Sequence, residues 1–123
     1  MKRFVLIALG GVLLVPAAAH AQRISPMQAG NFARVCSKPA GASVCDAYIT
    51  GMADAGALAK INDKNEGDAN APAGFCIPAS ENAASMRSKV ISWLKGHSDS
   101  LSKPVGESVF RALHDSYPCS ATK

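Results

Sequence analysis

The strongest constraint on the fold of this 123-residue chain is its set of four cysteines, Cys36, Cys45, Cys76 and Cys119. An even number of cysteines in a short exported chain is typical of a disulfide framework. None of the four belongs to a Cys-x-x-Cys pair, and their spacing does not match a zinc site, so redox or metal chemistry is not indicated. We therefore expect two structural disulfides, for which four cysteines allow three pairings.

The first 21 residues predict that the chain is exported. Lys2 and Arg3 precede an apolar run, and Ala19-His20-Ala21 places small residues where signal peptidase reads them. The run is shorter than the roughly 20 residues that a membrane span needs. We expect residues 1–21 to be a cleaved signal peptide and residues 22–123 to form a single periplasmic domain without membrane insertion.

Apolar residues recur at helical spacing in four segments, and no segment alternates as a strand does. The first helix is expected to begin at Ser25-Pro26 and to end at residues 38–41, the second to run from a Ser43 cap to about Ala59, the third from a Ser80 cap to Gly96, and the fourth from Ser102-Pro104 to Pro118. The predicted fold class is all-α: a small disulfide-stapled bundle of about four main helices.

The order of these helices selects one disulfide pairing. Cys36 ends the first helix and Cys45 begins the second, and a short connection between helices makes an antiparallel hairpin. Cys76 lies just before the third helix and Cys119 just after the fourth. If these two helices are also antiparallel, the pairs are Cys36–Cys45 and Cys76–Cys119.

Catalytic patterns are weak, so the sequence indicates a binding protein and not an enzyme. His97 and His114 are interpreted as helix-capping or surface residues, and Asp54 and Asp115 as single carboxylates. No phosphate-binding loop or nucleophile elbow is present, and we expect no metal or cofactor. Without residues 1–21 the net charge is near +2, with scattered basic residues, which does not favour nucleic acid as a partner.

The arrangement of residues resembles the Rap/Tai family of immunity proteins, which protect bacteria from peptidoglycan amidase effectors of the type VI secretion system. The resemblance rests on Cys45-x-x-Tyr48-x-x-Gly51-x-x-Asp54-Ala55, Phe75-Cys76-Ile-Pro78, Val90-Ile-Ser-Trp93-Leu94 and Tyr117-Pro118-Cys119. It implies a periplasmic homodimer that binds its cognate amidase, a Cys-His enzyme, and occludes the catalytic cleft. The motif residues, including Gly51 and Asp54, are interpreted as scaffold.

The contact surface is predicted in the polar stretch between the second and third helices. Residues 61–74 cannot bury apolar surface, so we expect an exposed, mobile loop there. Such a segment at a helix junction can enter a cleft, and the predicted partner-binding residues are Asn62, Asp63, Lys64, Asn65, Glu66 and Asp68. The alternative is a surface loop without a role in binding.

Two other functions fit the same features. One is a periplasmic acid-stress chaperone, which opens at low pH to expose apolar surface. The other is an exported binding domain without any toxin partner. Nine carboxylates in the whole chain give only modest acid sensitivity, which favours the immunity interpretation over the chaperone.

Overall fold

The computed structural model describes residues 23–119, so the signal peptide predicted for residues 1–21 lies outside the described part. Its helices are α1 (Ala29–Cys36), the 3-10 helix η1 (Pro39–Gly41), α2 (Ala42–Asn65), α3 (Ala83–Gly96), the 3-10 helix η2 (Ser98–Ser102) and α4 (Val105–Ser116). Within residues 23–119 there is no β-strand, only an isolated bridge between Gln28 and Pro104. The predicted all-α fold with four main helices is confirmed. None of the helices in this described range has the length and hydropathy of a membrane span.

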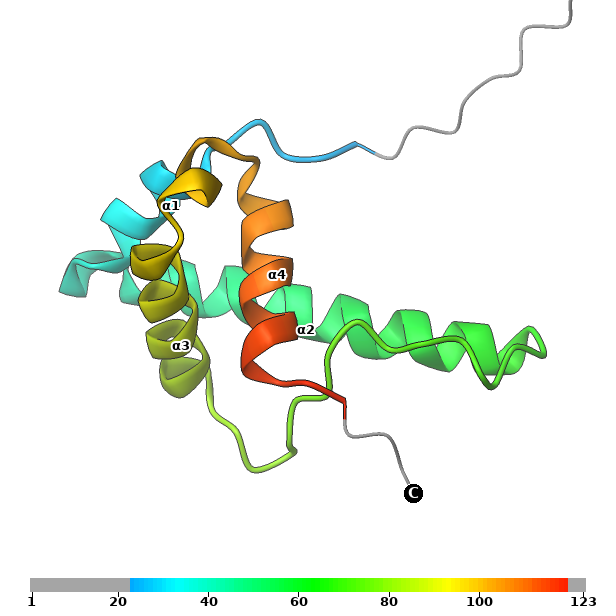
Figure 1. Ribbon diagram of the computed structural model, residues 1–123. Coiled ribbons are helices and arrows are strands. Elements are labelled where there is room, and N and C mark those ends of the chain that lie inside the picture. Colours follow the sequence, from blue (N-terminus) through cyan, green and yellow to red (C-terminus); the bar gives the residue numbers. More distant parts are fainter. Residues whose placement is uncertain (1–22, 120–123) are drawn as a thin grey trace, which may run out of the picture.

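The core lies where α1, α3, α4 and the first half of α2 meet. Its largest fully buried apolar side chains are Ile49, Leu94, Leu113, Val90, Val105 and Val109. Figure 1 shows α4 crossing α2, with α1 and α3 gathered at the N-terminal end of α2. No residue of α2 after Ile49 is buried, and this second half of the helix extends past α4, away from the core.

The first helix begins later than the sequence predicts, because the chain before it pairs with the chain before α4. The Ala29 amide donates to the Lys103 carbonyl oxygen at 2.9 Å, and the Val105 amide donates to the Met27 carbonyl oxygen at 2.7 Å. This long-range pairing holds residues 27–28 extended up to the start of α1 at Ala29. The prediction that Ser25-Pro26 begins the helix is therefore wrong.

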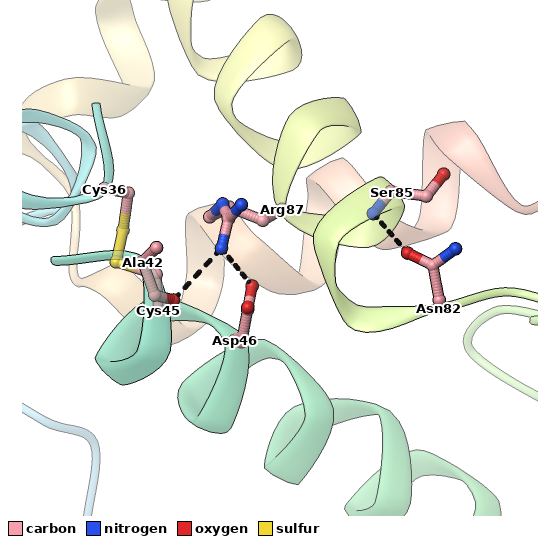
Figure 2. A network of polar contacts seen from close by, with 7 residues as sticks. All are labelled: Cys36, Ala42, Cys45, Asp46, Asn82, Ser85 and Arg87. Atoms are coloured by element: carbon pink, nitrogen blue, oxygen red, sulfur yellow. Dashed lines mark hydrogen bonds and ion pairs between the residues drawn. A yellow bond between two sulfur atoms is a disulfide. The ribbon is translucent and has the colours of Figure 1, made fainter. Parts of the chain in front are cut away.

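Two more predicted caps are replaced by other contacts, which Figure 2 shows. Helix α2 begins at Ala42, before Ser43, and the Asp46 carboxylate accepts a hydrogen bond from Arg87 at 2.7 Å instead of closing a capping box. The cap of α3 is Asn82, whose side-chain oxygen accepts from the Ser85 amide at 2.9 Å. Ser80 stands in the turn before it, where the Glu81 amide donates to the Pro78 carbonyl oxygen.

Both predicted disulfides are present. Cys36–Cys45 closes the hairpin of α1 and α2, with 5.7 Å between the Cα atoms. Cys76–Cys119 joins the segment before α3 to the end of α4, with 4.9 Å between the Cα atoms. Each bridge therefore ties helix ends together that the order of the helices already brings close.

Candidate partner-binding surface

Helix α2 continues to Asn65, through the first third of the stretch predicted to be a loop. It ends in a Schellman motif: Gly67 has φ +96°, its amide donates to the Lys64 carbonyl oxygen, and the Asp68 amide donates to the Asp63 carbonyl oxygen at 2.8 Å. The loop prediction is thus wrong for residues 61–65, which end the helix and include the predicted partner-binding residues Asn62, Asp63, Lys64 and Asn65. The available signal was Gly67, since glycine is the residue that most readily adopts this conformation after a helix.

The six predicted partner-binding residues nevertheless lie together. We call residues 62–68 the tip, and α2 from Gly51 onward together with residues 66–77 the finger. Every tip residue is exposed except Asp63, which is half-buried. Asp63, Glu66 and Asp68 carry three negative charges against the single positive charge of Lys64, so the tip is net acidic. Figure 1 shows the tip at the far end of α2, remote from the bundle.

The return segment, residues 69–77, is held against α2 and is not the free, mobile loop that the sequence predicts. The Lys60 ammonium donates to the Ala69 carbonyl oxygen at 2.9 Å and also to that of Ala71. Further along, the Phe75 ring packs on Gly56, where an added Cβ would lie 2.6 Å from the ring. The finger is therefore an ordered projection in which an irregular segment packs along a helix. Long irregular segments in small domains are usually functional.

Three contacts fix the base of the finger to α4. Besides the Cys76–Cys119 disulfide, the Cys76 amide donates to the Tyr117 carbonyl oxygen at 2.8 Å. The His114 ring nitrogen Nδ1 lies 2.6 Å from the Gly74 carbonyl oxygen. His114 is exposed, which agrees with its interpretation as a surface residue, and its ring also contacts the backbone of the finger.

A charged cluster anchors the segment that leads from the finger to α3. The Glu81 carboxylate accepts hydrogen bonds from Lys89 at 2.6 Å and from the Tyr117 hydroxyl at 2.9 Å. The Lys89 ammonium also lies 4.3 Å from the centre of the Tyr117 ring. The hydrogen bond from Lys89, more than any other contact, lowers the pKa of Glu81 from 4.5 to about 2. The Glu81 carboxylate therefore stays ionised, and paired with Lys89, well into the acid range.

The remaining candidate residues do not form a catalytic centre. His97 stacks on Trp93 with 3.9 Å between the ring centres, and the Trp93 indole N–H donates to Asp115 at 2.7 Å. Neither histidine has a cysteine thiol to activate, since all four cysteines are disulfide-bonded. Among residues 23–119 no cluster of His, Cys, Asp and Glu could hold a metal ion.

Two motif residues interpreted as scaffold are exposed on the finger instead. A Cβ added to Gly51 would meet nothing within 4 Å, so no neighbour in the protomer requires glycine there. The Asp54 carboxylate has no hydrogen bond or ion pair with another residue in the range 23–119, and it lines a groove beside α2. Sequence reasoning missed the exposure of both residues because a helical pattern does not tell which face of a helix lacks a neighbour.

One protein family has a sequence model that matches nearly the whole described part of the chain. A family model described as Rap1a immunity proteins matches residues 28–119, which is more than half of the chain. No curated protein and no solved structure matches the chain. The matched range contains the four α-helices, both disulfides and the whole finger.

Proposed function

Because the chain belongs to the Rap1a immunity protein family, we propose that it protects its cell from a peptidoglycan amidase effector of the type VI secretion system. The chain is an immunity protein, a class that acts by binding an effector. The amidase as the target and occlusion of its catalytic cleft as the mechanism are what we add. The finger is the observation that supports this proposal most directly.

The finger suits insertion into a cleft for physical reasons. Helix α2 alone is about 36 Å long, and its second half leaves the core, so the tip can enter a cleft without a collision of the bundle. Because the disulfide, Lys60 and the Schellman turn already hold the finger, binding costs little conformational entropy. The acidic tip favours a cleft with a positive wall. The protein contributes no catalytic group and acts as a non-enzymatic inhibitor.

We place the mature protein in the periplasm, as residues 22–123 released from a signal peptide of residues 1–21. Two disulfides in a small domain fit an oxidising compartment, which is where such bonds persist. Peptidoglycan amidases act in the same compartment. An inhibitor there meets the effector before the cell wall is cut.

We also propose that the protein is a homodimer, for which the outer face of α2 provides support. That face carries no charge and is exposed throughout; its members are Val44, Ala47, Gly51, Ala55 and Leu58. Val44 and Leu58 are 64% and 63% exposed. Counted from Gly51, the two alanines lie four residues away and the two larger residues seven. A two-fold axis at Gly51 between antiparallel copies would therefore set Ala47 against Ala55 and Val44 against Leu58 of the other copy.

Light scattering with size-exclusion chromatography tests the dimer and this face separately. Wild type is expected to elute as a dimer and Leu58→Glu as a monomer, because the substitution buries a carboxylate against the apolar Val44 of the other copy at each end of the contact. Ala57→Glu, on another side of the same helix, is the control and should remain dimeric. A monomeric wild type would contradict the homodimer, whereas a dimeric Leu58→Glu would contradict only the face.

The function itself is tested by inhibition of a type VI amidase, either one encoded next to this chain's gene or a related one. The purified, oxidised mature protein is mixed with the amidase, and cleavage of peptidoglycan fragments is followed by chromatography. We expect inhibition at one inhibitor chain per enzyme at neutral pH, without an acid trigger. Absence of both binding and inhibition would refute the proposal. Binding of unfolded proteins through exposed apolar surface, seen only near pH 2–3, would favour an acid-stress chaperone.

A further inference from the structure

A groove runs along the finger, separate from the tip. It has a volume of about 620 Å³ and lies between α2 and the return segment. Its apolar lining comes from both sides: Ala53, Ala57 and Ile61 from α2, and Phe75 and Ile77 from the return segment. A concave apolar surface of this size is typical of a preformed binding site.

Three charged side chains reach the groove, and two of them already have partners. Lys60 donates to the carbonyl oxygens of the return segment, and Glu81 accepts from Lys89 and Tyr117. Asp54, which is exposed, makes no polar contact with residues in the range 23–119. The groove therefore presents an apolar floor and one free negative charge.

The walls of the groove are fixed before any partner arrives. The glycine at position 56 lets Phe75 approach the helix, and the Cys76–Cys119 disulfide anchors the lower end of the return segment to α4. A preformed wall spares the entropy cost of ordering a loop on binding. The floor of the groove joins the core through the buried Phe75 and Met86, while its α2 side is open to a partner, since no residue of α2 beyond Ile49 is buried.

We propose that this groove is a second contact for the effector, and that it holds an apolar side chain next to an arginine or lysine of the amidase. The proposal rests on the function proposed above. The apolar floor accepts the apolar side chain, and Asp54 pairs with the cation. The groove is continuous with the tip through Ile61, which directly precedes Asn62, so one effector surface can reach both. The tip then blocks the cleft, while the groove selects which amidase is bound.

The charge at position 54 provides the first test, with the same amidase as the probe. We expect the Kd of Asp54→Asn to rise about 10-fold, because the partner's cation loses its ion pair. We expect the Kd of Asp54→Lys to rise about 100-fold, because the new positive charge also repels that cation. The dependence of the Kd on salt should also become shallower in Asp54→Asn. Asp99→Asn and Asp99→Lys, which change charge equally on the exposed 3-10 helix η2, are the controls and should stay within about 2-fold of wild type.

The apolar floor provides the second test. Ala57→Trp fills the groove from α2 and should weaken binding about 10-fold or more by excluding the partner side chain. Ala59→Trp adds the same ring two residues later, on a side of α2 that does not line the groove, and should leave the Kd nearly unchanged. Thermal unfolding and circular dichroism establish that each variant is folded, which is expected because both alanines are exposed.

The outcomes separate this proposal from the proposed function. Weakened binding in the variants at positions 54 and 57, with unchanged controls, supports the groove as a contact. If wild type inhibits the amidase and all these variants bind within about 2-fold of it, the groove proposal is refuted while the immunity function stands. If wild type itself does not bind, the proposed function is refuted, and the groove proposal with it.

Discussion

The substitution of Gly56 by alanine tests whether the return segment really packs on α2. An added Cβ would lie 2.6 Å from Phe75 Cζ and 2.8 Å from Phe75 Cε2, where carbon atoms normally stay about 3.5–4.0 Å apart. The ring cannot move away easily, because Phe75 is buried, packs on Phe110 with 5.4 Å between the ring centres, and precedes the anchored Cys76. Overpacking of this kind costs about 1–3 kcal/mol.

The same substitution also has a favourable part. Alanine is a better helix former than glycine by about 1 kcal/mol, so Gly56→Ala should lower the free energy of unfolding by about 1 kcal/mol net. Gly51→Ala is the matched control on the same helix. Its Cβ enters open space, so only the favourable part remains and the free energy of unfolding should rise by about 1 kcal/mol. The two variants should then differ by about 10 °C in Tm.

Urea and thermal unfolding by circular dichroism measure both variants. They are best compared in the Leu58→Glu background, because self-association would otherwise raise the apparent stability by mass action. If Gly56→Ala is stabilised as much as Gly51→Ala, the ring of Phe75 is not fixed against α2. The description of the finger as an ordered projection would then be wrong.

Three further predictions concern the anchors and the tip of the finger. The pKa of Glu81 is lowered from 4.5 to about 2, so its ionised carboxylate stabilises the fold above about pH 4.5 and this stabilisation is lost as the pH falls towards 2. Urea titrations of wild type and Glu81→Gln should therefore give different free energies of unfolding at neutral pH and converging ones near pH 2. Replacing both cysteines of Cys76–Cys119 by alanine should lower the free energy of unfolding by about 4 kcal/mol and weaken amidase binding. The same change at Cys36–Cys45 should lower it by about 2.5 kcal/mol and leave the affinity of the folded protein intact. Unfolding curves and calorimetry measure the two effects. Neutralising the tip with Asp63→Asn, Glu66→Gln and Asp68→Asn together should slow association with the amidase and reduce its salt dependence in stopped-flow measurements; an unchanged rate would exclude the tip as an electrostatic contact.

The sequence predicts well those features that depend on local order along the chain. Both disulfides follow from which helix ends are neighbours, and Pro104 and Pro118 bracket the fourth helix as the structure has it. The starts of α1 and α2 were misplaced because distant groups compete with local caps, whereas α3 simply takes the nearby Asn82 as its cap in place of Ser80. Arg87 binds Asp46 from a helix far along the chain, and the Lys103 carbonyl takes the Ala29 amide. No local pattern contains these partners.

The clustering of the predicted partner-binding residues was correct, but their local structure was not. The acidic residues between the second and third helices do cluster, yet the return segment is ordered by contacts that cross the sequence, such as Lys60 with Ala71 and Gly56 with Phe75. A polar composition predicts exposure, and exposure was correctly predicted. A polar composition does not predict whether the backbone of an exposed segment has hydrogen-bond partners. Such partners fix the return segment as one wall of the groove.

The two glycines of α2 are equivalent in the sequence but have different surroundings in the fold. Each costs about 1 kcal/mol of helix propensity relative to alanine. At position 56 the protomer offsets that cost, because the glycine admits Phe75. At position 51 nothing in the described protomer approaches, so no contact within residues 23–119 offsets the same cost. Since the surrounding face is apolar and exposed, the offsetting contact is expected from a second copy of the chain, which would hold two fingers on one particle.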